Sequence, residues 1–259
     1  FQEYLHFKAK TDVRASTHIY FKELETEWEH FLENQLIEAV FLPDIEERNA
    51  YYVSILKKII YEDIPQIFSL QHTELLWRLV KLIGSKPGIY LDFSQLSQEI
   101  GISGKTISLY LYYLEEAFIV KKVYNFSKNL ITSEKKLKRY YLASPSFSRA
   151  LTDFIKKGEL VENLFISLYN YRFFWRDPYQ HEVDFVAVQD DRIIPIEVKC
   201  KKAVHGKDLR SLVVFSRKFN IPEAWVYYHG WEEETRMVRD LKVVLKPLIL
   251  SSYRRVSFS

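Results

Sequence analysis

Residues 182–199 read EVDFVAVQDDRIIPIEVK, two apolar runs of strand length separated by the polar residues 189–192. Short apolar runs on either side of a turn rich in Asp predict a β-hairpin. Side chains alternate along a strand, so Glu197 and Lys199 are expected on one face and Ile194, Ile196 and Val198 on the other. The hairpin therefore carries an acid and an amine on the same face of its second strand.

Asp184 lies inside the first run, between Val183 and Phe185. A lone carboxylate in such surroundings is costly unless something pairs with it. A divalent cation that bridges Asp184 and Glu197 would explain the arrangement, and hard oxygen ligands suit Mg²⁺ or Mn²⁺. The alternative is a cross-strand ion pair with no chemistry, because structural ion pairs are more common than sites.

Asp184 is followed thirteen positions later by Glu197-Val198-Lys199. This order resembles the (P)D…(D/E)xK pattern of the restriction-endonuclease-like nucleases. The resemblance implies that Asp184, Glu197 and the carbonyl of Val198 hold Mg²⁺ (or Mn²⁺), with Glu162 of the preceding helix as a further or water-mediated ligand. Lys199 would orient the attacking water or stabilise charge on the phosphate.

The composition allows several packed cores in a chain of 259 residues with 47% hydrophobic residues. The net charge is only +3, but 37 Lys and Arg residues leave room for local basic patches. A single cysteine, Cys200, excludes an intrachain disulfide framework and fits a reducing compartment. No apolar run approaches membrane-spanning length, so we expect a cytoplasmic protein with no membrane partner.

Residues 1–63 are predicted to be a helical segment, because apolar residues recur there at helical spacing. The segments 1–5, 28–32 and 38–43 resemble the stretch after the nucleotide-binding core of AAA-type archaeal and bacterial ATPases that end in a winged helix and a restriction-endonuclease-like domain. The chain opens on Phe1, so we expect a fragment. The resemblance implies that ATP binds only in an upstream ATPase domain absent from this chain.

Residues 64–142 are predicted to form a winged helix-turn-helix. Gly101-Ile102-Ser103 supplies the turn, and Ser103 is expected to cap the second helix. Residues 118–126 and 138–142 would be the wing strands, joined by a loop. The side chains expected to meet DNA lie off the apolar stripe or flank it: Lys105, Ser108, Tyr112, Lys121, Lys122, Lys135 and Lys136. The alternative is a solvated basic face used for protein contacts.

Residues 143–245 are predicted to be the nuclease-like domain, with a tail at 246–259. Helices are expected at 147–155, 160–171 and 208–218, and strands at 173–175 and 224–228 besides the hairpin. The whole chain is thus expected to be a multi-domain α/β protein with an αβββαβ restriction-endonuclease-like core. The segment Gly104-Lys105-Thr106 lacks the glycine that a phosphate-binding loop needs at position 99.

Three functions remain open at this point. The first is a Mg²⁺-dependent nuclease joined to a DNA-binding winged helix. The second keeps the nuclease-like fold without catalysis, as a module that recognises DNA or a protein partner for the ATPase. The third is a protein-interaction module, suggested by the 16% aromatic content.

Overall fold

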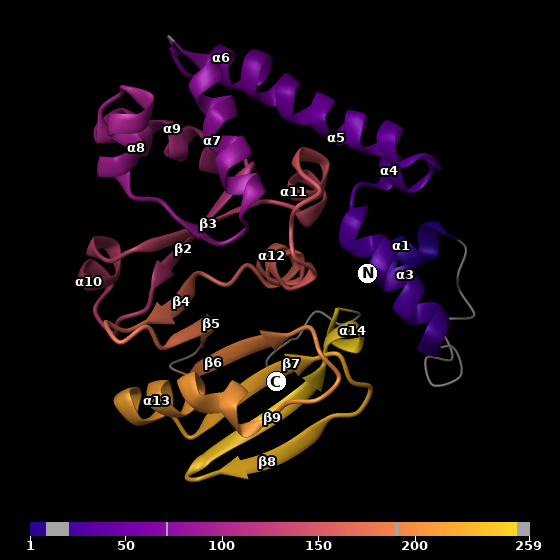
Figure 1. Ribbon diagram of the computed structural model, residues 1–259, viewed down its shortest axis with the longest axis vertical. Helices are drawn as coiled ribbons and strands as arrows, with labels where there is room; N and C mark the ends of the chain where they lie inside the picture. The colour runs from indigo at the N-terminus through magenta and orange to yellow at the C-terminus, as the bar shows by residue number, and fades with distance from the viewer. Residues whose placement is uncertain (9–20, 71, 190–191, 253–259) are drawn as a thin grey trace. The chain divides into compact units, whose positions relative to one another are not determined.

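The computed structural model describes residues 1–8, 21–70, 72–189 and 192–252 of the mixed α/β chain (Figure 1). Two compact units are interleaved along the sequence. The first unit comprises Phe1–Glu29, Val123–Lys136 and Leu168–Ser259, and the second comprises His30–Lys122 and Leu137–Ser167. These limits do not coincide with the domain boundaries predicted after residues 63, 142 and 245, which stay predictions.

The second unit is mainly helical. Its elements are α4 (Ile37–Val40), α5 (Ile45–Lys58), a π-helical turn (Ile59–Asp63), α6 (Ile64–Ile67), α7 (Thr73–Ser85), β1 (Ile89–Tyr90), α8 (Phe93–Ile100), α9 (Gly104–Glu116), β3 (Lys138–Leu142) and α11 (Pro145–Leu151). Strand β2 (Val120–Asn125) and helix α12 (Lys157–Tyr169) begin in this unit, and α3 (Phe21–Glu33) ends in it. The predicted helical character of residues 21–63 is confirmed for the described positions.

Local capping explains the helix–turn–helix segment. The Asp92 side chain accepts hydrogen bonds from two backbone N–H groups at the start of α8, and α8 ends at Gly101 with φ +76°. Ser103 then caps α9 by accepting a hydrogen bond from the N–H of Thr106 at 3.1 Å. Strand β1 pairs antiparallel with β3, with Ile89 opposite Tyr140. The element order α7-β1-α8-α9-β2-β3 therefore contains every helix and strand that the sequence predicts here.

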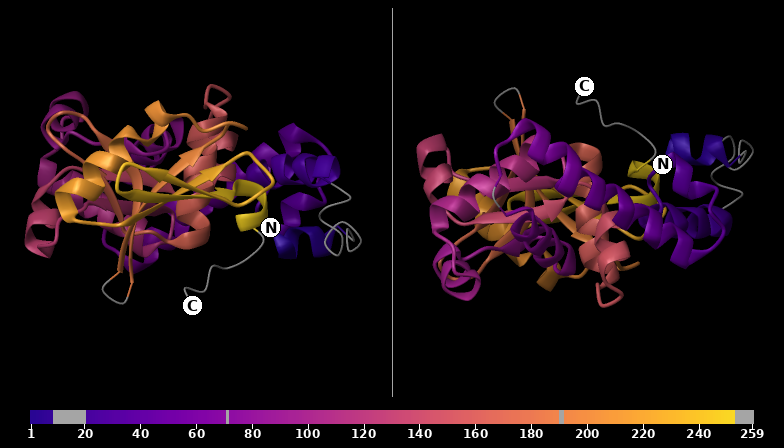
Figure 2. Two further views of the ribbon diagram at one scale, coloured as in Figure 1. Left: turned by 90° about the horizontal axis from the view of Figure 1, so that it is seen from below. Right: turned by 90° about the horizontal axis from the view of Figure 1, so that it is seen from above.

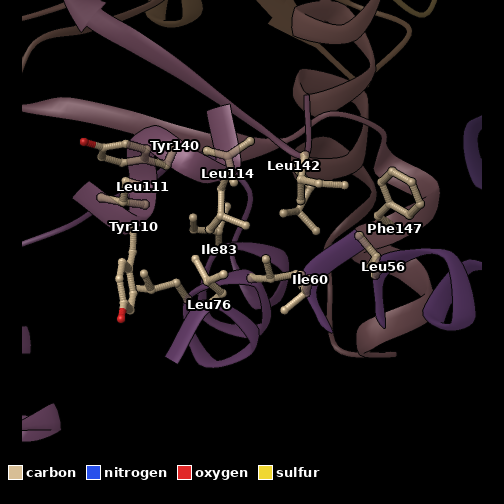
Figure 3. Packing of buried hydrophobic residues seen from close by; sticks show 14 of the residues in the cluster. Leu56, Ile60, Leu76, Ile83, Tyr110, Leu111, Leu114, Tyr140, Leu142 and Phe147 are labelled. Atoms are coloured by element: carbon tan, nitrogen blue, oxygen red, sulfur yellow. The ribbon is translucent and has the colours of Figure 1, made fainter. Parts of the chain in front are cut away.

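A single hydrophobic core holds the second unit together (Figure 3). Leu56 and Ile60 come from the long N-terminal helical run, Leu76 and Ile83 from α7, and Leu114 from α9, and all five are fully buried or nearly so. Burying side chains of this size contributes roughly 1.5–3 kcal/mol each. The two helices of the helix–turn–helix are thus positioned by the same core as the helices before them.

Several predicted limits in this part of the chain are wrong. The helical run does not stop at residue 63, because it continues through the π-helical turn into α6, whose first turn contains Pro65. The predicted loop 127–137 contains helix α10 (Leu130–Lys135), which Asn129 caps. The helix predicted at 147–155 spans Pro145–Leu151, and Gly158, predicted as a separator, lies in the first turn of α12.

The first unit is built on a mixed sheet with strand order β2-β4-β5-β6-β7-β9-β8, to which β2 contributes Val123–Asn125. Its other elements are α1 (Gln2–Phe7), most of α3, α10, β4 (Phe173–Arg176), β5 (Glu182–Gln189), β6 (Arg192–Lys199), a 3₁₀ turn (Gly206–Leu209), α13 (Arg210–Phe219), β7 (Glu223–Tyr228), β8 (Glu234–Val238), β9 (Leu241–Pro247) and α14 (Leu248–Ser251). Helix α13 packs on one face of this sheet through Leu212 and Phe215. The chain order α12-β4-β5-β6-α13-β7 is the predicted αβββαβ succession of elements.

Strands β8 and β9, which follow the predicted strand β7, were not predicted. β7 and β9 run parallel, and β9 pairs antiparallel with β8 at the edge of the sheet, where both can be followed in yellow in Figure 2. The predicted tail at 246–259 begins inside β9 and continues as α14, where Leu248 and Ile249 are buried. Residues 253–259 of that tail, and residues 190–191 of the predicted hairpin turn, lie outside the described residues. Within the described residues, no helix is long and apolar enough to cross a membrane.

Candidate functional site

The predicted hairpin positions the two acids. β5 and β6 pair antiparallel from Phe185 opposite Ile196 to Gln189 opposite Arg192. Continuing that register by one pair puts Asp184 opposite Glu197. Because residues opposite each other in a sheet share a face, both carboxylates are directed to the same side.

A β-bulge lies at the same place. β4 and β5 pair through Phe173 with Val186 and through Trp175 with Val183, so β4 advances by two residues while β5 advances by three. The extra residue on β5 falls between these pairs, at Asp184 or Phe185. Bulges re-aim side chains and are over-represented beside active sites. The distortion therefore lies at Asp184 or at the residue that follows it.

Asp184 is held by the neighbouring strand. Its side chain is largely buried, and Oδ2 accepts a hydrogen bond of 2.8 Å from the backbone N–H of Val198. The Nζ atom of Lys199 lies 3.7 Å from the same oxygen. The buried carboxylate of Asp184 therefore has a hydrogen-bond donor and a positive charge beside it within the hairpin.

Glu197 is more deeply buried than Asp184, with 3% of its surface exposed. Its Oε2 accepts a hydrogen bond from Nζ of Lys199. Burial raises the pKa of Glu197 well above its usual value, the charge of Asp184 raises it further, and Lys199 opposes both effects. The three side chains thus form one coupled cluster, in which the ammonium group of Lys199 stabilises two crowded carboxylates.

Two further charged residues adjoin this cluster and were missed by the sequence reasoning. Nζ of Lys201 lies 2.6 Å from Oδ1 of Asp208, and the backbone N–H of His205 donates to the other oxygen at 2.8 Å. Burial alone would raise the pKa of Asp208, but these two donors and the charge of Lys199 lower it. Lys201 follows Lys199 by two positions, a spacing that could have signalled it.

Glu162, predicted as a further metal ligand, has partners within its own unit. It lies on α12, and its Oε2 accepts a hydrogen bond of 2.7 Å from Nη2 of Arg139 and one of 3.4 Å from the hydroxyl of Tyr141. Arg139 is 6% exposed and donates from Nε to the carbonyl of Gly88. Glu162 belongs to the second unit and Asp184 to the first. Within the second unit, Glu162 is the counter-ion of a buried arginine.

A larger metal-binding cluster is not found in the described part of the chain. No group of three or more His, Cys, Asp or Glu side chains there is arranged to hold a metal ion. The oxygen donors that converge in the first unit are the carboxylates of Asp184 and Glu197. The predicted ligand set is therefore reduced, within this unit, to those two carboxylates and the carbonyl of Val198.

The residues predicted to bind DNA fall into two groups. Lys105, Ser108 and Tyr112 are exposed and follow one another at spacings of three and four along α9, so they share one face of the helix. Lys135, at the end of α10, is exposed as well. These four side chains are accessible to a ligand.

The other three predicted lysines have partners within the protein. Nζ of Lys121 donates to the carbonyl of Ile166 at 3.2 Å, and burial lowers its pKa. Lys122 pairs with Glu115 at 2.8 Å. Nζ of Lys136 donates to a backbone carbonyl at 3.3 Å, and burial and then the charge of Lys218 lower its pKa. Their ammonium groups are therefore less available to phosphates than those of the first group.

Comparison with known families divides the chain near residue 157. Residues 38–157 match DUF8612, a domain of unknown function. Residues 157–246 match DUF4143, a domain of unknown function that is often found with AAA ATPase-like proteins. No curated protein and no solved structure gives a significant match.

Proposed function

We propose that this chain is the DNA-binding C-terminal part of a AAA-type ATPase and carries a Mg²⁺-dependent nuclease site. The observation that supports this most strongly is that the carboxylates of Asp184 on β5 and Glu197 on β6 both lie close to the ammonium group of Lys199. In this proposal residues 143–245 have the restriction-endonuclease-like fold, and residues 64–142 are a winged helix. Nucleotide binding belongs to an upstream ATPase domain.

The donor set fits a hard divalent cation. Two carboxylates face each other, and the carbonyl of Val198 lies between Glu197 and Lys199 in sequence. Burial raises the pKa of Glu197 most and the charge of Asp184 raises it further, and a bound cation would favour the ionised form against both effects. Asp184, Glu197 and the carbonyl of Val198 would hold Mg²⁺ or Mn²⁺, with Glu162 left to its arginine. Such an ion, when bound, supplies charge neutralisation at the phosphate and lowers the pKa of a bound water.

The side chains of the chain then have distinct roles. Asp184 is oriented by the N–H of Val198, so its carboxylate direction is fixed before a ligand arrives. Glu197 is deeply buried and excludes water from the base of the site. Lys199, whose ammonium group contacts both acids and whose side chain is 26% exposed, can turn toward a phosphate oxygen or toward the attacking water.

The proposed DNA contact uses the exposed face of α9. Lys105 would contact a phosphate, and Ser108 and Tyr112 can donate hydrogen bonds to phosphate or base edges. The order of elements around α9, together with the β1–β3 pairing, supports a winged helix. Lys135 would add a further phosphate contact from α10.

Cleavage assays with Mn²⁺ or Mg²⁺ test the nuclease proposal. We expect the wild-type chain to cut DNA, and Asp184→Asn and Lys199→Ala to abolish cutting while far-ultraviolet circular dichroism shows that both stay folded. Lys58→Ala is the matched control, because Lys58 is an exposed lysine in the last turn of α5, outside both proposed sites. Undiminished cleavage by either site variant would remove the mechanism.

A second candidate function is a catalytically inactive nuclease-like module that recognises DNA or a protein partner for the ATPase. The observation that favours it is the ion pair of Glu162 with Arg139, which commits one predicted acid to another role. Under this reading Lys199 serves only to neutralise the buried acids. DNA binding by the wild type with no cleavage in any divalent metal would support this module over the nuclease.

A further inference from the structure

The turn between β4 and β5 presents an exposed aromatic ring. Tyr179 is 84% exposed at the tip of this turn, which runs from Asp177 to His181. The backbone N–H of Asp177 donates to the carbonyl of His181 at 3.0 Å, and that of Gln180 donates to the carbonyl of Asp177 at 3.1 Å. The exposed ring offers a flat face on which a nucleic-acid base can stack.

Side-chain contacts close the turn further. The carboxylate of Asp177 accepts the backbone N–H of His181 at 2.9 Å and lies 2.9 Å from Nδ1 of the same histidine. Gln180 adopts a left-handed backbone conformation with φ +67°. These contacts fix the backbone of the turn that carries the ring. The stacking of a ligand on Tyr179 therefore costs the protein little conformational entropy.

The turn lies at the same end of the sheet as the acidic cluster. The β4–β5 ladder ends at the pair Arg176–Glu182, and Asp184 is two residues beyond it on β5. Asp184 follows Tyr179 by five positions, so their Cα atoms lie at most about 18 Å apart. The ring is therefore within a few nucleotides of the carboxylates.

Basic side chains follow the cluster on its other strand. Lys202 and Lys207 are exposed on the loop that leaves β6 after Lys199. A single strand of DNA bound over the carboxylates would thus contact the exposed ammonium groups on the loop after β6 and the aromatic ring on the turn between β4 and β5. Grooves that bind single strands combine the same two features, positive charge for phosphates and aromatic rings for bases.

We propose that Tyr179 stacks on an unpaired base beside the scissile phosphate, so that the site takes single-stranded DNA or a single-stranded end. This inference rests on the proposed nuclease site and names its substrate class. The faces of bases inside a duplex are covered by neighbouring bases, whereas an unpaired base can lie on the ring. Tyr179 is a positioning residue, and the phosphate chemistry remains with Asp184, Glu197 and Lys199.

Fluorescence anisotropy in EDTA measures this contact without cleavage. The probes are a fluorescein-labelled oligothymidylate and a blunt duplex of the same length. We expect Tyr179→Ala to bind the oligothymidylate about 5- to 50-fold more weakly, with an unchanged salt dependence, while Tyr179→Phe and Tyr179→Trp bind like the wild type. Met237→Ala is the matched control, because Met237 is 66% exposed on the edge strand β8.

An oligonucleotide with one abasic position, moved along the strand, locates the stacked base. The wild type should lose affinity at one position, and Tyr179→Ala should be insensitive there. Equal binding of the oligothymidylate by wild type and Tyr179→Ala, or tighter wild-type binding of the duplex, would overturn the inference. Because EDTA prevents metal-dependent cleavage, these outcomes are independent of whether the chain is a nuclease.

Discussion

The backbone N–H of Val198 donates a 2.8 Å hydrogen bond to Oδ2 of Asp184. This bond joins the end of β6 to the bulged part of β5 and fixes the direction of the carboxylate. Because Val198 lies between Glu197 and Lys199, the same bond keeps both of those side chains on the face that Asp184 occupies. The position of the charged side chains is therefore set by the backbone of the hairpin.

Loss of the lysine should destabilise the fold. In Lys199→Ala the carboxylate of Glu197 stays buried without its ammonium partner. We expect a loss of about 1–3 kcal/mol in the free energy of unfolding at neutral pH, less than for a fully buried pair because the lysine is partly exposed. Urea denaturation measures it. Lys207→Ala should stay within about 0.5 kcal/mol of the wild type, and an equally small effect of Lys199→Ala would contradict the pairing.

The stability of the chain should fall as pH rises above the ordinary pKa of glutamate. The pKa of Glu197 is raised in the folded state, so between the unfolded and the folded pKa the native protein binds one proton more than the unfolded chain. The contribution of Glu197 is therefore most favourable below about pH 4.3 and is lost as pH rises through the folded pKa. Glu197→Gln should flatten this decline.

Thermal unfolding of the wild type and of Glu197→Gln between pH 5 and 8 measures this decline in stability. Glu223→Gln is the control, since the pKa of Glu223 is lowered: burial would raise it, but hydrogen bonds from Trp225 and Lys242 outweigh burial. A wild type and a Glu197→Gln variant with the same pH profile would show that Glu197 ionises normally.

The role of Glu162 is open to a direct test. As the counter-ion of the buried Arg139, it should stabilise the second unit, and Glu162→Gln should lower the free energy of unfolding by about 2–4 kcal/mol. The affinity of the chain for Mn²⁺ should not change. A double-mutant cycle with Arg139→Met measures the coupling, and a loss of metal affinity in Glu162→Gln at full stability would restore the predicted ligand role.

The hairpin and the helix–turn–helix could be predicted because local signals coincide with the fold there. Two apolar runs on either side of a polar turn indicate β5 and β6, and Gly101 with Ser103 fixes the turn before α9. The pairing of Glu162 with Arg139 could not be predicted, because it joins residues 23 positions apart whose proximity depends on packing. The strands β8 and β9 were not predicted, because β7 pairs directly with β9 and β8 lies between these two strands only along the chain.

The two groups of basic residues should differ in DNA binding. Lys105→Ala removes an exposed charge on α9 and should weaken binding uniformly across sequences, with the salt slope reduced by about 1. Lys121→Ala should leave the slope unchanged, because its ammonium group is bonded to the carbonyl of Ile166. Filter binding at several salt concentrations measures both. Equal slopes for the two variants would remove α9 from the proposed DNA interface.

Calorimetric titration with Mn²⁺ tests the central claim, that Asp184 and Glu197 hold one divalent cation beside Lys199. The account predicts one binding event in the wild type and none in Asp184→Asn, with Glu162→Gln binding as the wild type does. A wild type that binds no metal at millimolar concentration, or an Asp184→Asn variant that binds with unchanged affinity, would contradict it.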